Sequence, residues 1–311
     1  MTADATEVFE EHRPVLDGVA YRMLGRVADA EDVVQEAWLR WAAADHAQVR
    51  EPRGYLVRVT TRLAIDRLRQ VQSRREAYVG SWLPEPVVTG PGPGPAARAP
   101  DGAERAVLAE SVSLAVLVVL ESLSPLERAV FVLREAFGFP YAEIAGTLER
   151  SEAAVRQLAG RARQHVTERK PRFEVDPTLR RDLTERFLKA AADGDVRGLV
   201  SVLAPDARLV SDSGGAAKAP RRVVVGADRI SRFLAAVAPE GMREPASGVR
   251  FLELNGGPAV LLAVAGRPDT VFSLEVSGGL VRTVHLIRNP AKLAHLAGAG
   301  ERSGLRGRLL L

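Results

Sequence analysis

The sequence predicts a multidomain protein in which two all-α domains precede an α+β domain with an antiparallel sheet. The chain has 311 residues, which is more than one hydrophobic core usually organises. Residues 80–102 contain six prolines and five glycines, so this stretch forms neither a helix nor a central strand. Apolar residues recur at helical spacing on both sides of it, and strand-like runs dominate only after residue 176.

Periodicity and capping signals divide each domain into elements. In the first domain, residues 5–76, helical spacing is clear around residues 33–41 and 56–68. The linker takes residues 77–103. In the second domain, residues 104–170, Ser124 caps a helix that has Pro125 at its first position. The third domain, residues 176–297, is expected to hold helices at 179–192, 196–203 and 228–237 and strands at 207–212, 221–225, 249–254, 259–264, 270–276 and 280–287. We expect residues 298–311 to be a mobile tail.

Composition excludes several classes of protein. Apolar residues make up 46% and charged residues 26% of the chain, which is typical of a folded globular protein. Cysteine is absent, which excludes disulfides, thiol catalysis and Cys-ligated zinc and is compatible with a reducing cytoplasm. The N-terminus lacks an apolar signal core, and the most apolar run, residues 112–120, is too short to span a bilayer. We therefore expect a cytoplasmic protein with no membrane contact, no metal and no other cofactor.

Charge is distributed in blocks along the chain. Residues 50–75 hold eight arginines and two acids, and residues 150–172 hold seven basic residues and two acids. Residues 29–36 hold four carboxylates and no base. Nucleic-acid binding needs such local basic clusters rather than a large net charge. The first domain is therefore predicted to have an acidic surface and a basic one, and the second domain a basic one.

Residues 141–163 have the pattern of a helix-turn-helix. A short helix at 141–148 is followed by a tight turn at 149–150, and Ser151 caps a second helix. One face of that helix is apolar, and the other carries Arg156, Gln157 and Arg163. Arg156 and Arg163 lie seven residues apart and so align, as a recognition helix in the major groove requires. The alternative is a solvated basic face on an ordinary helical bundle.

The acidic segment Asp-Ala-Glu-Asp-Val-Val-Gln-Glu-Ala-Trp, residues 29–38, resembles region 2 of bacterial RNA polymerase sigma factors. The resemblance implies a helical bundle with one helix that docks on the clamp helices of the largest polymerase subunit. The spacing agrees, because Asp32, Glu36 and Arg40 fall four residues apart on one helix face. The alternative is an ordinary solvated helix face. The residues implied at this interface are Asp29, Asp32, Gln35, Glu36 and Arg40.

The next segment, residues 52–69, resembles the part of the same region that melts the promoter and reads the minus-ten element. Single-stranded DNA is held by basic grooves and by pockets for flipped bases. Arg62 stands where many family members carry Asn. The candidate contacts with the displaced strand are Arg58, Arg62, Arg69, Arg74 and Arg75.

The helix-turn-helix resembles sigma region 4, the reader of the minus-thirty-five element. Only the Pro/Gly linker separates the two regions, which is typical of the extracytoplasmic-function (ECF) group. The resemblance implies core RNA polymerase, through its clamp helices and flap, and promoter DNA as partners, with no catalytic residue in this chain. The resemblance does not indicate whether an anti-sigma partner exists. The candidate contacts with the minus-thirty-five element are Ser151, Arg156, Gln157, Arg161 and Arg163.

Two further motifs narrow the resemblance. Trp-Leu-Pro-Glu-Pro, residues 82–86, is similar to a linker motif of sigma factors that carry a SnoaL-like C-terminal domain. Asn-Pro-Ala-Lys-Leu, residues 289–293, is similar to a second motif, with Ala291 where an Asp is usual. Residues 212–218 loosely match a third, glycine-rich motif, which lacks the Gly-Lys-Ser/Thr of a phosphate-binding loop.

The resemblance implies a cone with a strongly curved antiparallel sheet, whose pocket takes a small apolar ligand or whose surface binds another segment. We hypothesise a regulatory module in which the linker docks near residues 212–218. The alternative is a tryptophan packed for stability beside polyproline-like structure. The residues expected at this contact are Trp82, Leu83, Pro84, Glu85, Pro86, Asp212, Gly214, Gly215, Lys218, Asn289, Pro290, Lys292 and Leu293.

Two functions from other classes compete with this interpretation. A SnoaL-type enzyme could use His285, Asp206 and Asp212 as an acid/base set, although a fold alone does not imply a reaction. A ligand-sensing helix-turn-helix repressor would bind duplex DNA unaided, usually as a dimer on a palindrome. Dependence of promoter binding on polymerase discriminates the sigma factor from the repressor.

Overall fold

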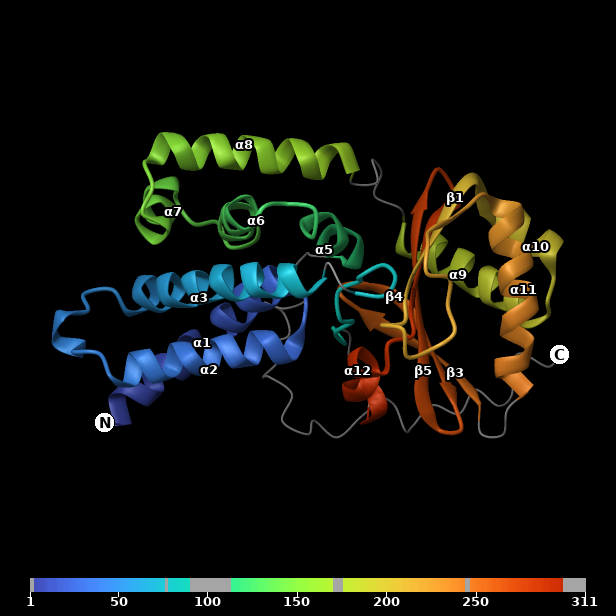
Figure 1. Cartoon of the computed structure of the whole chain (residues 1–311), viewed down its shortest axis with the longest axis horizontal. Coiled ribbons are helices and arrows are strands. Elements are labelled where there is room, and N and C mark those ends of the chain that lie inside the picture. The colour runs from blue at the N-terminus through green and yellow to red at the C-terminus, as the bar shows by residue number, and fades with distance from the viewer. Residues whose placement is uncertain (1–2, 76–77, 90–112, 170–175, 244–246, 299–311) are drawn as a thin grey trace. The chain divides into compact units, whose positions relative to one another are not determined.

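The computed structural model describes residues 3–75, 78–89, 113–169, 176–243 and 247–298 (Figure 1). The chain divides into two compact units. Unit 1 combines Met1–Ala77 with Arg98–Lys170, and unit 2 combines Tyr78–Ala97 with Pro171–Leu311. Both helical segments therefore belong to one unit, and the described part of the predicted linker belongs to the unit of the α+β domain. The expected start of the second domain at residues 104–112 and the tail from residue 299 lie outside the described residues.

Unit 1 is all helical, as the sequence predicted. Its first three helices pack around Trp41, whose indole Nε1 donates a hydrogen bond of 2.8 Å to the carbonyl of Ala5. The helices of unit 1 are α1 (Ala3–Leu24), α2 (Val27–Ala42), the short η1 (His46–Gln48), α3 (Pro52–Arg75), α5 (Leu114–Leu120), α6 (Pro125–Phe131), the π-helical η2 (Val132–Ala136), α7 (Tyr141–Leu148) and α8 (Glu152–Arg169).

The predicted caps of the helix-turn-helix are confirmed. Ser124 and Glu127 form a capping box before Pro125 at the start of α6. Between α7 and α8 the chain turns at Glu149, which adopts a left-handed conformation with φ 52°. The Ser151 hydroxyl then accepts a hydrogen bond of 3.2 Å from the amide of Ala154. These local contacts set the angle between the two helices.

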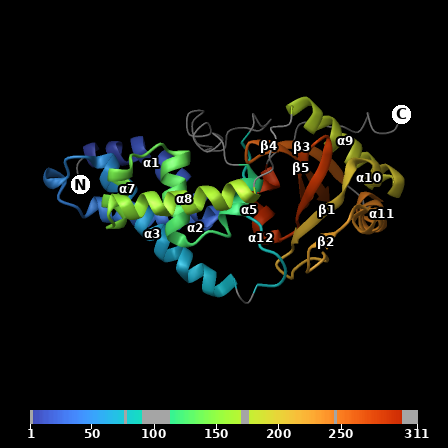
Figure 2. The same ribbon diagram turned by 90° about the horizontal axis from the view of Figure 1, so that it is seen from above.

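Unit 2 is an α+β domain with one six-stranded sheet in the order β2-β1-β6-β5-β4-β3. Helices α9, α10 and α11 lie on one face of the sheet and α12 on the other (Figures 1 and 2). Its elements are α9 (Pro177–Ala192), α10 (Val196–Val202), β1 (Leu203–Asp212), β2 (Val224–Val225), α11 (Ala227–Arg243), β3 (Gly248–Leu254), β4 (Gly257–Val264), β5 (Arg267–Ser277), β6 (Leu280–Ile287), α12 (Pro290–Leu293) and η3 (Ala294–Gly298).

The sheet is mixed, which corrects the prediction of an antiparallel one. Strands β3 to β6 form an antiparallel meander joined by tight turns, but β1 and β6 pair in parallel, with Val210 opposite His285. The alternation of apolar and polar residues predicts a strand, but it does not predict whether a strand far away in the sequence pairs with it in parallel or antiparallel. That direction is set by the route of the chain through α11, which returns it to the far edge of the sheet before the meander begins.

Apolar side chains fill the space between the helices and the sheet. Phe187 of α9 and Phe272 of β5 meet edge to face at 6.3 Å between ring centroids, and Leu234 of α11 is fully buried in the same cluster. This core fixes the sheet against α9 to α11 and leaves the opposite face for other segments. In the described part of the chain, no helix has the length and apolar character needed to cross a membrane.

Candidate functional site

Helix α2 presents the acidic row that the sequence predicted. Val33, Ala37 and Trp41 are buried, which confirms the predicted helix face. The opposite face is exposed, and on it Nε of Arg40 lies 3.1 Å from Oε1 of Glu36. The exposed members of the predicted polymerase interface are Asp32, Gln35, Glu36 and Arg40.

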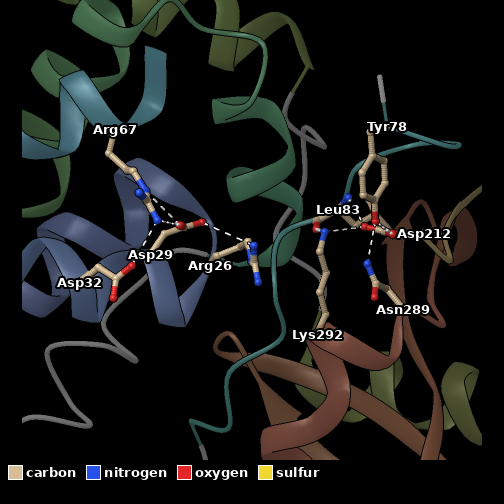
Figure 3. Close-up of polar contacts among 9 residues, drawn as sticks. All are labelled: Arg26, Asp29, Asp32, Arg67, Tyr78, Leu83, Asp212, Asn289 and Lys292. Atoms are coloured by element: carbon tan, nitrogen blue, oxygen red, sulfur yellow. Dashed lines mark hydrogen bonds and ion pairs between the residues drawn. The ribbon is translucent and has the colours of Figure 1, made fainter. Parts of the chain in front are cut away.

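Asp29 differs from these four residues. Its side chain is only 8% exposed and points toward α3, where Arg67 Nη2 lies 2.7 Å from Oδ1 (Figure 3). Arg26 Nη1 lies 3.8 Å from the other carboxylate oxygen. Because a buried carboxylate with two cationic neighbours is held in place, Asp29 supports the helix from within. The sequence predicted Asp29 at the polymerase interface, whereas in the structure its side chain is buried against α3.

Arg67 is a residue that sequence reasoning missed. From α3 it contacts Asp29 and also Asp32, whose Oδ2 lies 3.2 Å from Arg67 Nη2 (Figure 3). The guanidinium therefore ties helix α3 to the exposed carboxylate of α2. In the sequence Arg67 is one arginine of a basic block that follows an acidic helix. Spacing along the chain cannot show which arginine pairs with which carboxylate of that helix.

The arginines predicted to hold the displaced strand fall into different settings. Arg58 is exposed and lies over the ring of Tyr55 at 5.6 Å. Arg69 is exposed and pairs with Asp66 at 3.1 Å. The side chains of Arg74 and Arg75, at the end of α3, lie outside the described residues.

Arg62 contacts the helix-turn-helix. Its Nε donates a hydrogen bond of 2.9 Å to the carbonyl of Thr147, and its Nη2 lies 2.9 Å from Oε1 of Glu149. A cavity of about 620 Å³ opens beside this contact, lined by Tyr55 and Arg58 from α3 among other residues. The structure thus brings a predicted minus-ten residue against the turn between α7 and α8.

The predicted recognition face of α8 is exposed. The Arg156 guanidinium lies over the Tyr141 ring at 4.6 Å, and Arg163 Nη2 donates a hydrogen bond of 2.8 Å to the Tyr141 hydroxyl. The hydrogen bonds to Glu135 and then to Tyr141 raise the pKa of Arg163, so its charge is secure. Gln157 is exposed on the same helix.

Two predicted minus-thirty-five residues take local roles in the structure. Arg161 reaches toward α6, where its Nε lies 3.2 Å from Oε1 of Glu127. Ser151 is exposed and uses its hydroxyl as the cap of α8. Arg161 and Arg163 thus both contact carboxylates of neighbouring helices, with side chains 63% and 46% exposed, and Arg156 and Gln157 are exposed on the same helix.

In unit 2 a buried ion pair holds the linker. Asp212 at the end of β1 and Lys292 of α12 are 0% and 1% exposed, and Lys292 Nζ lies 2.6 Å from Asp212 Oδ2. The same oxygen accepts a hydrogen bond of 2.8 Å from the amide of Leu83, while Lys292 Nζ donates one of 2.5 Å to the Leu83 carbonyl (Figure 3). We call Leu83, Asp212 and Lys292 the clasp, because both backbone groups of one linker residue are bound by one ion pair.

Aromatic and amide groups surround the clasp. The Tyr78 hydroxyl donates a hydrogen bond to Asp212 Oδ1 and accepts one of 2.8 Å from Nδ2 of Asn289. Lys292 Nζ lies 3.2 Å from the centroid of the Trp82 ring. Gly214 has φ 58°, and a Cβ there would lie 2.6 Å from Asn289 Nδ2, so the close approach requires glycine.

The rest of the linker motif lies along the same domain. His295 Nδ1 lies 3.0 Å from Oε1 of Glu85, and Nε2 lies 2.7 Å from the carbonyl of Pro86. Further on, Val88 forms a β-bridge with Leu254 at the end of β3. The linker therefore adds a short stretch of extended chain to the edge of the sheet.

Most of the predicted linker contact is assembled, with some differences in role. Gly215 packs beside Val79, Leu293 is buried, and Pro84 is buried. Lys218 and Pro290 are exposed, and Lys218 contributes only a carbonyl, which accepts a hydrogen bond of 2.8 Å from Arg288. The sequence missed Tyr78 and His295, because both lie just outside the motifs that carry the resemblance.

The acid/base set of the rival enzyme is not assembled. Asp206 is exposed and pairs with Arg282 at 2.8 Å, while Asp212 belongs to the clasp. His285 is buried on β6, with Nε2 at 3.4 Å from Oε1 of Glu275. Within the ranges that the structure describes, no group of three or more His, Asp or Glu side chains is arranged to hold a metal ion.

Burial of His285 predicts a pH-dependent stability. Burial lowers the pKa of His285 from its ordinary value near 6.5, with Glu275 acting in the opposite direction. The folded domain thus keeps the imidazole neutral while the unfolded chain takes up a proton below pH about 6.5. We expect the free energy of unfolding of unit 2 to fall with decreasing pH below that value, by up to about 1.4 kcal/mol per pH unit.

Chemical denaturation at pH 7 and pH 5 measures this dependence. His285→Gln should lose part of the decrease, because the proton uptake by the unfolded chain is then removed. His12→Gln in unit 1 is the matched control and should leave the pH dependence of unit 2 unchanged. An identical decrease in the His285 variant and in the parent would contradict the prediction.

Two family models and several known proteins are similar to this chain. The family model Sigma-70 region 2 matches residues 8–75, and Sigma-70, region 4 matches residues 113–166. The ECF RNA polymerase sigma factor SigJ of Mycobacterium tuberculosis is 46% identical over 227 residues, which are 73% of this chain and 70% of that protein. The probable ECF RNA polymerase sigma factor SigI of the same species is 35% identical over 285 residues, which are 91% of this chain and 92% of that protein. The crystal structure of M. tuberculosis SigJ matches with a TM-score of 0.72 and 37% identity, covering 94% of this chain and 99% of that one.

Proposed function

Because the chain belongs to the extracytoplasmic-function sigma factors, with a C-terminal SnoaL-like domain, we propose that its C-terminal domain regulates polymerase and promoter binding through the linker. Members of this family bind RNA polymerase and recognise promoters, and they are initiation factors, not enzymes. We also propose which surfaces of the chain make each of these contacts and how the C-terminal domain acts on them. We place this activity in the cytoplasm, where the polymerase works.

Polymerase binding is assigned to the exposed row of α2. Asp32, Gln35 and Glu36 offer acceptors to the clamp helices from a face whose opposite side is packed in the core of the bundle. Arg67 holds the carboxylate of Asp32 from behind. A rigid row of carboxylates at the surface is suited to a specific and electrostatically steered contact.

Promoter binding is assigned to arginines of α3 and α8. On α8, the exposed Arg156 and Arg163, which lie seven residues apart, would enter the major groove, where arginine pairs with guanine edges. On α3, Arg58 stacks on Tyr55, a combination of cation and aromatic ring that suits a single strand. Arg62 belongs to the same set once it is released from the helix-turn-helix.

Regulation is assigned to the clasp, and one observation carries it. The amide and the carbonyl of Leu83 are both bound by a buried ion pair of the C-terminal domain. The linker is therefore fixed to that domain directly after region 2, which limits where region 4 can reach. A bound linker and a released linker are two states that polymerase or a ligand of the cone could favour differently.

In vitro transcription with purified core polymerase tests the proposal. The full chain should direct specific initiation, and a chain that ends after Lys170 should also initiate but with altered strength, because its linker is released. Promoter DNA should be bound tightly only in the presence of core polymerase, unlike a repressor. Equal activity of the two chains would remove the regulatory assignment. Failure of both chains to associate with core polymerase would remove the assignment of a sigma factor's surfaces.

A further inference from the structure

The segment between β1 and β2 carries a cluster of exposed cations that the proposed function does not use. After Asp212 the sequence has no acidic residue until Asp228, and Lys218, Arg221 and Arg222 fall in this interval. All three residues are exposed. We call Lys218, Arg221 and Arg222 the basic loop.

The charge of the basic loop is not neutralised by the described part of the chain. None of its three cations forms an ion pair with a described carboxylate. The carboxylates of the sheet are engaged by other groups, since Asp212 belongs to the clasp and Asp206 pairs with Arg282 at 2.8 Å. Asp269 accepts two hydrogen bonds of 2.9 Å from Arg288. The positive charge of the loop is therefore available to an anion outside this chain.

The sheet holds the backbone of the basic loop in place. The carbonyl of Lys218 accepts a hydrogen bond of 2.8 Å from Nη1 of Arg288. The carbonyl of Pro220 accepts one from the hydroxyl of Ser211 on β1. Because a cation on a fixed backbone loses less conformational freedom on binding than one on a mobile loop, this cluster is preorganised for a ligand.

The basic loop lies beside the first residues that follow region 2. A Cβ placed on Gly80 would lie 3.9 Å from Cα of Arg221. Tyr78 is bound to the clasp (Figure 3), and only residues 76 and 77 separate it from Arg75, where α3 ends. Three residues of chain span at most on the order of 10 Å. The covalent connection therefore keeps the loop near the end of the helix to which the minus-ten contacts are assigned, in any orientation of the two units.

The composition of this segment favours the phosphate backbone of DNA over its bases as the ligand. Residues 213–229 contain no aromatic side chain, so the loop offers no platform on which bases stack. Arginine and lysine form charge-assisted hydrogen bonds with phosphate oxygens. Such contacts position a protein on duplex DNA and do not read its sequence.

We propose that the basic loop of the C-terminal domain binds the phosphate backbone of promoter DNA beside the minus-ten element. The inference rests on the proposed function and adds a third DNA-contacting surface to it, in the domain to which we assign regulation. The C-terminal domain then contributes to promoter affinity directly, besides fixing the linker. Because phosphate contacts carry no base recognition, the loop strengthens binding to every promoter of the factor about equally.

The salt dependence of promoter binding by the holoenzyme measures these contacts. The test variant combines Lys218→Gln, Arg221→Gln and Arg222→Gln, and the probe is a fluorescent promoter fragment from which the parent holoenzyme initiates. Each lost phosphate contact should reduce the slope of log Kd against log salt concentration by about 0.9, and three lost contacts should reduce it by about 2.7. At physiological salt we expect the Kd of the variant to rise roughly tenfold or more.

A variant that loses the same charge elsewhere in unit 2 is the matched control. Lys189→Gln, Arg197→Gln and Arg267→Gln remove three exposed cations from three different elements, α9, α10 and β5, and this variant should keep the slope of the parent. An equal reduction of the slope in both variants would show an effect of net charge alone and would overturn the proposal. Weaker association of the test variant with core polymerase in the absence of DNA would assign the loop to polymerase and would also overturn it.

Hydroxyl-radical cleavage locates the contact without removing any cation. Because the chain has no cysteine, an iron chelate is attached to Ala216→Cys beside the basic loop and, as the control, to Ala236→Cys on α11, and both positions are exposed. We expect cleavage of the promoter backbone beside the minus-ten element from position 216 and none from position 236. Absence of cleavage from position 216 in a complex that initiates transcription would contradict the proposal.

Two results distinguish a failure of this inference from a failure of the proposed function. A test variant that forms holoenzyme and initiates with the salt slope of the parent would remove the DNA contact of the basic loop and leave the sigma assignment intact. A parent chain that does not associate with core polymerase would remove the proposed function, and this inference with it.

Discussion

Replacing Lys292 with methionine is expected to release the linker from the C-terminal domain. The substitution leaves Asp212 buried without its cation and removes a donor from the Leu83 carbonyl. Breaking one partner of a buried ion pair costs about 3–5 kcal/mol, so amide exchange at Leu83 and in the following residues should accelerate roughly a hundredfold or more. Transcription by this variant should resemble that of the chain that ends after Lys170.

An exposed ion pair in the same domain provides the control for the buried pair of the clasp. Arg282 and Asp206 form an ion pair of 2.8 Å with side chains 45% and 75% exposed, and such pairs contribute only about 0–1 kcal/mol. Arg282→Gln should therefore leave linker exchange and transcription near those of the parent. Combining Asp212→Asn with Lys292→Met should recover part of the stability, because no uncompensated charge stays buried. Unchanged exchange at Leu83 in Lys292→Met would contradict the role of the clasp.

Reversing the charge of Asp32 is expected to abolish stable binding to core polymerase. In the proposed interface, the substitution turns a carboxylate that would meet donors on the clamp helices into a cation facing the same donors, and like charges in an interface cost several kcal/mol. We expect the Kd to rise roughly a hundredfold or more in Asp32→Arg, measured by equilibrium binding of the labelled chain to purified core enzyme. Arg67→Gln should raise the Kd less, by about tenfold, because the carboxylate stays but loses its support.

Two comparisons make this test specific. Asp182→Arg reverses an exposed carboxylate of α9 in unit 2, which also pairs with an arginine, and it should leave the Kd unchanged. The double variant of Asp32→Ala and Arg67→Gln should lose less affinity than the sum of the two single variants, because Arg67 acts partly through Asp32 and partly through the buried Asp29. A parent-like Kd in Asp32→Arg would place the polymerase contact elsewhere.

Much of the fold could be predicted from local patterns in the sequence. The strand at residues 280–287 and the helix at 141–148 have their predicted bounds, because alternation and capping are read within one element. Ser124 and Ser151 cap the helices that they were expected to cap. The parallel pairing of β1 with β6 could not be predicted in this way, since it joins strands separated by a helix and a meander.

In the candidate sites too, residues that depend on one helix or one motif could be predicted, and contacts between distant segments could not. Motif similarity named Asp212 and Lys292 separately, and the fold is needed to join them across Leu83. Pairs between distant segments, such as Arg67 with Asp29, have no local pattern at all. The exposed row of α2 was predictable because it depends on one helix, while the inward turn of Asp29 depends on where α3 lies.

The β-bridge between Val88 and Leu254 also bears on solubility. The third strand forms one border of the sheet, and unpaired borders invite association with other chains. The linker shields the end of this border through the bridge and through the amide of Thr89, which donates a hydrogen bond of 2.9 Å to the carbonyl of Glu253. A chain whose linker is detached should therefore self-associate more readily, because the segment to which we assign regulation also covers part of this border.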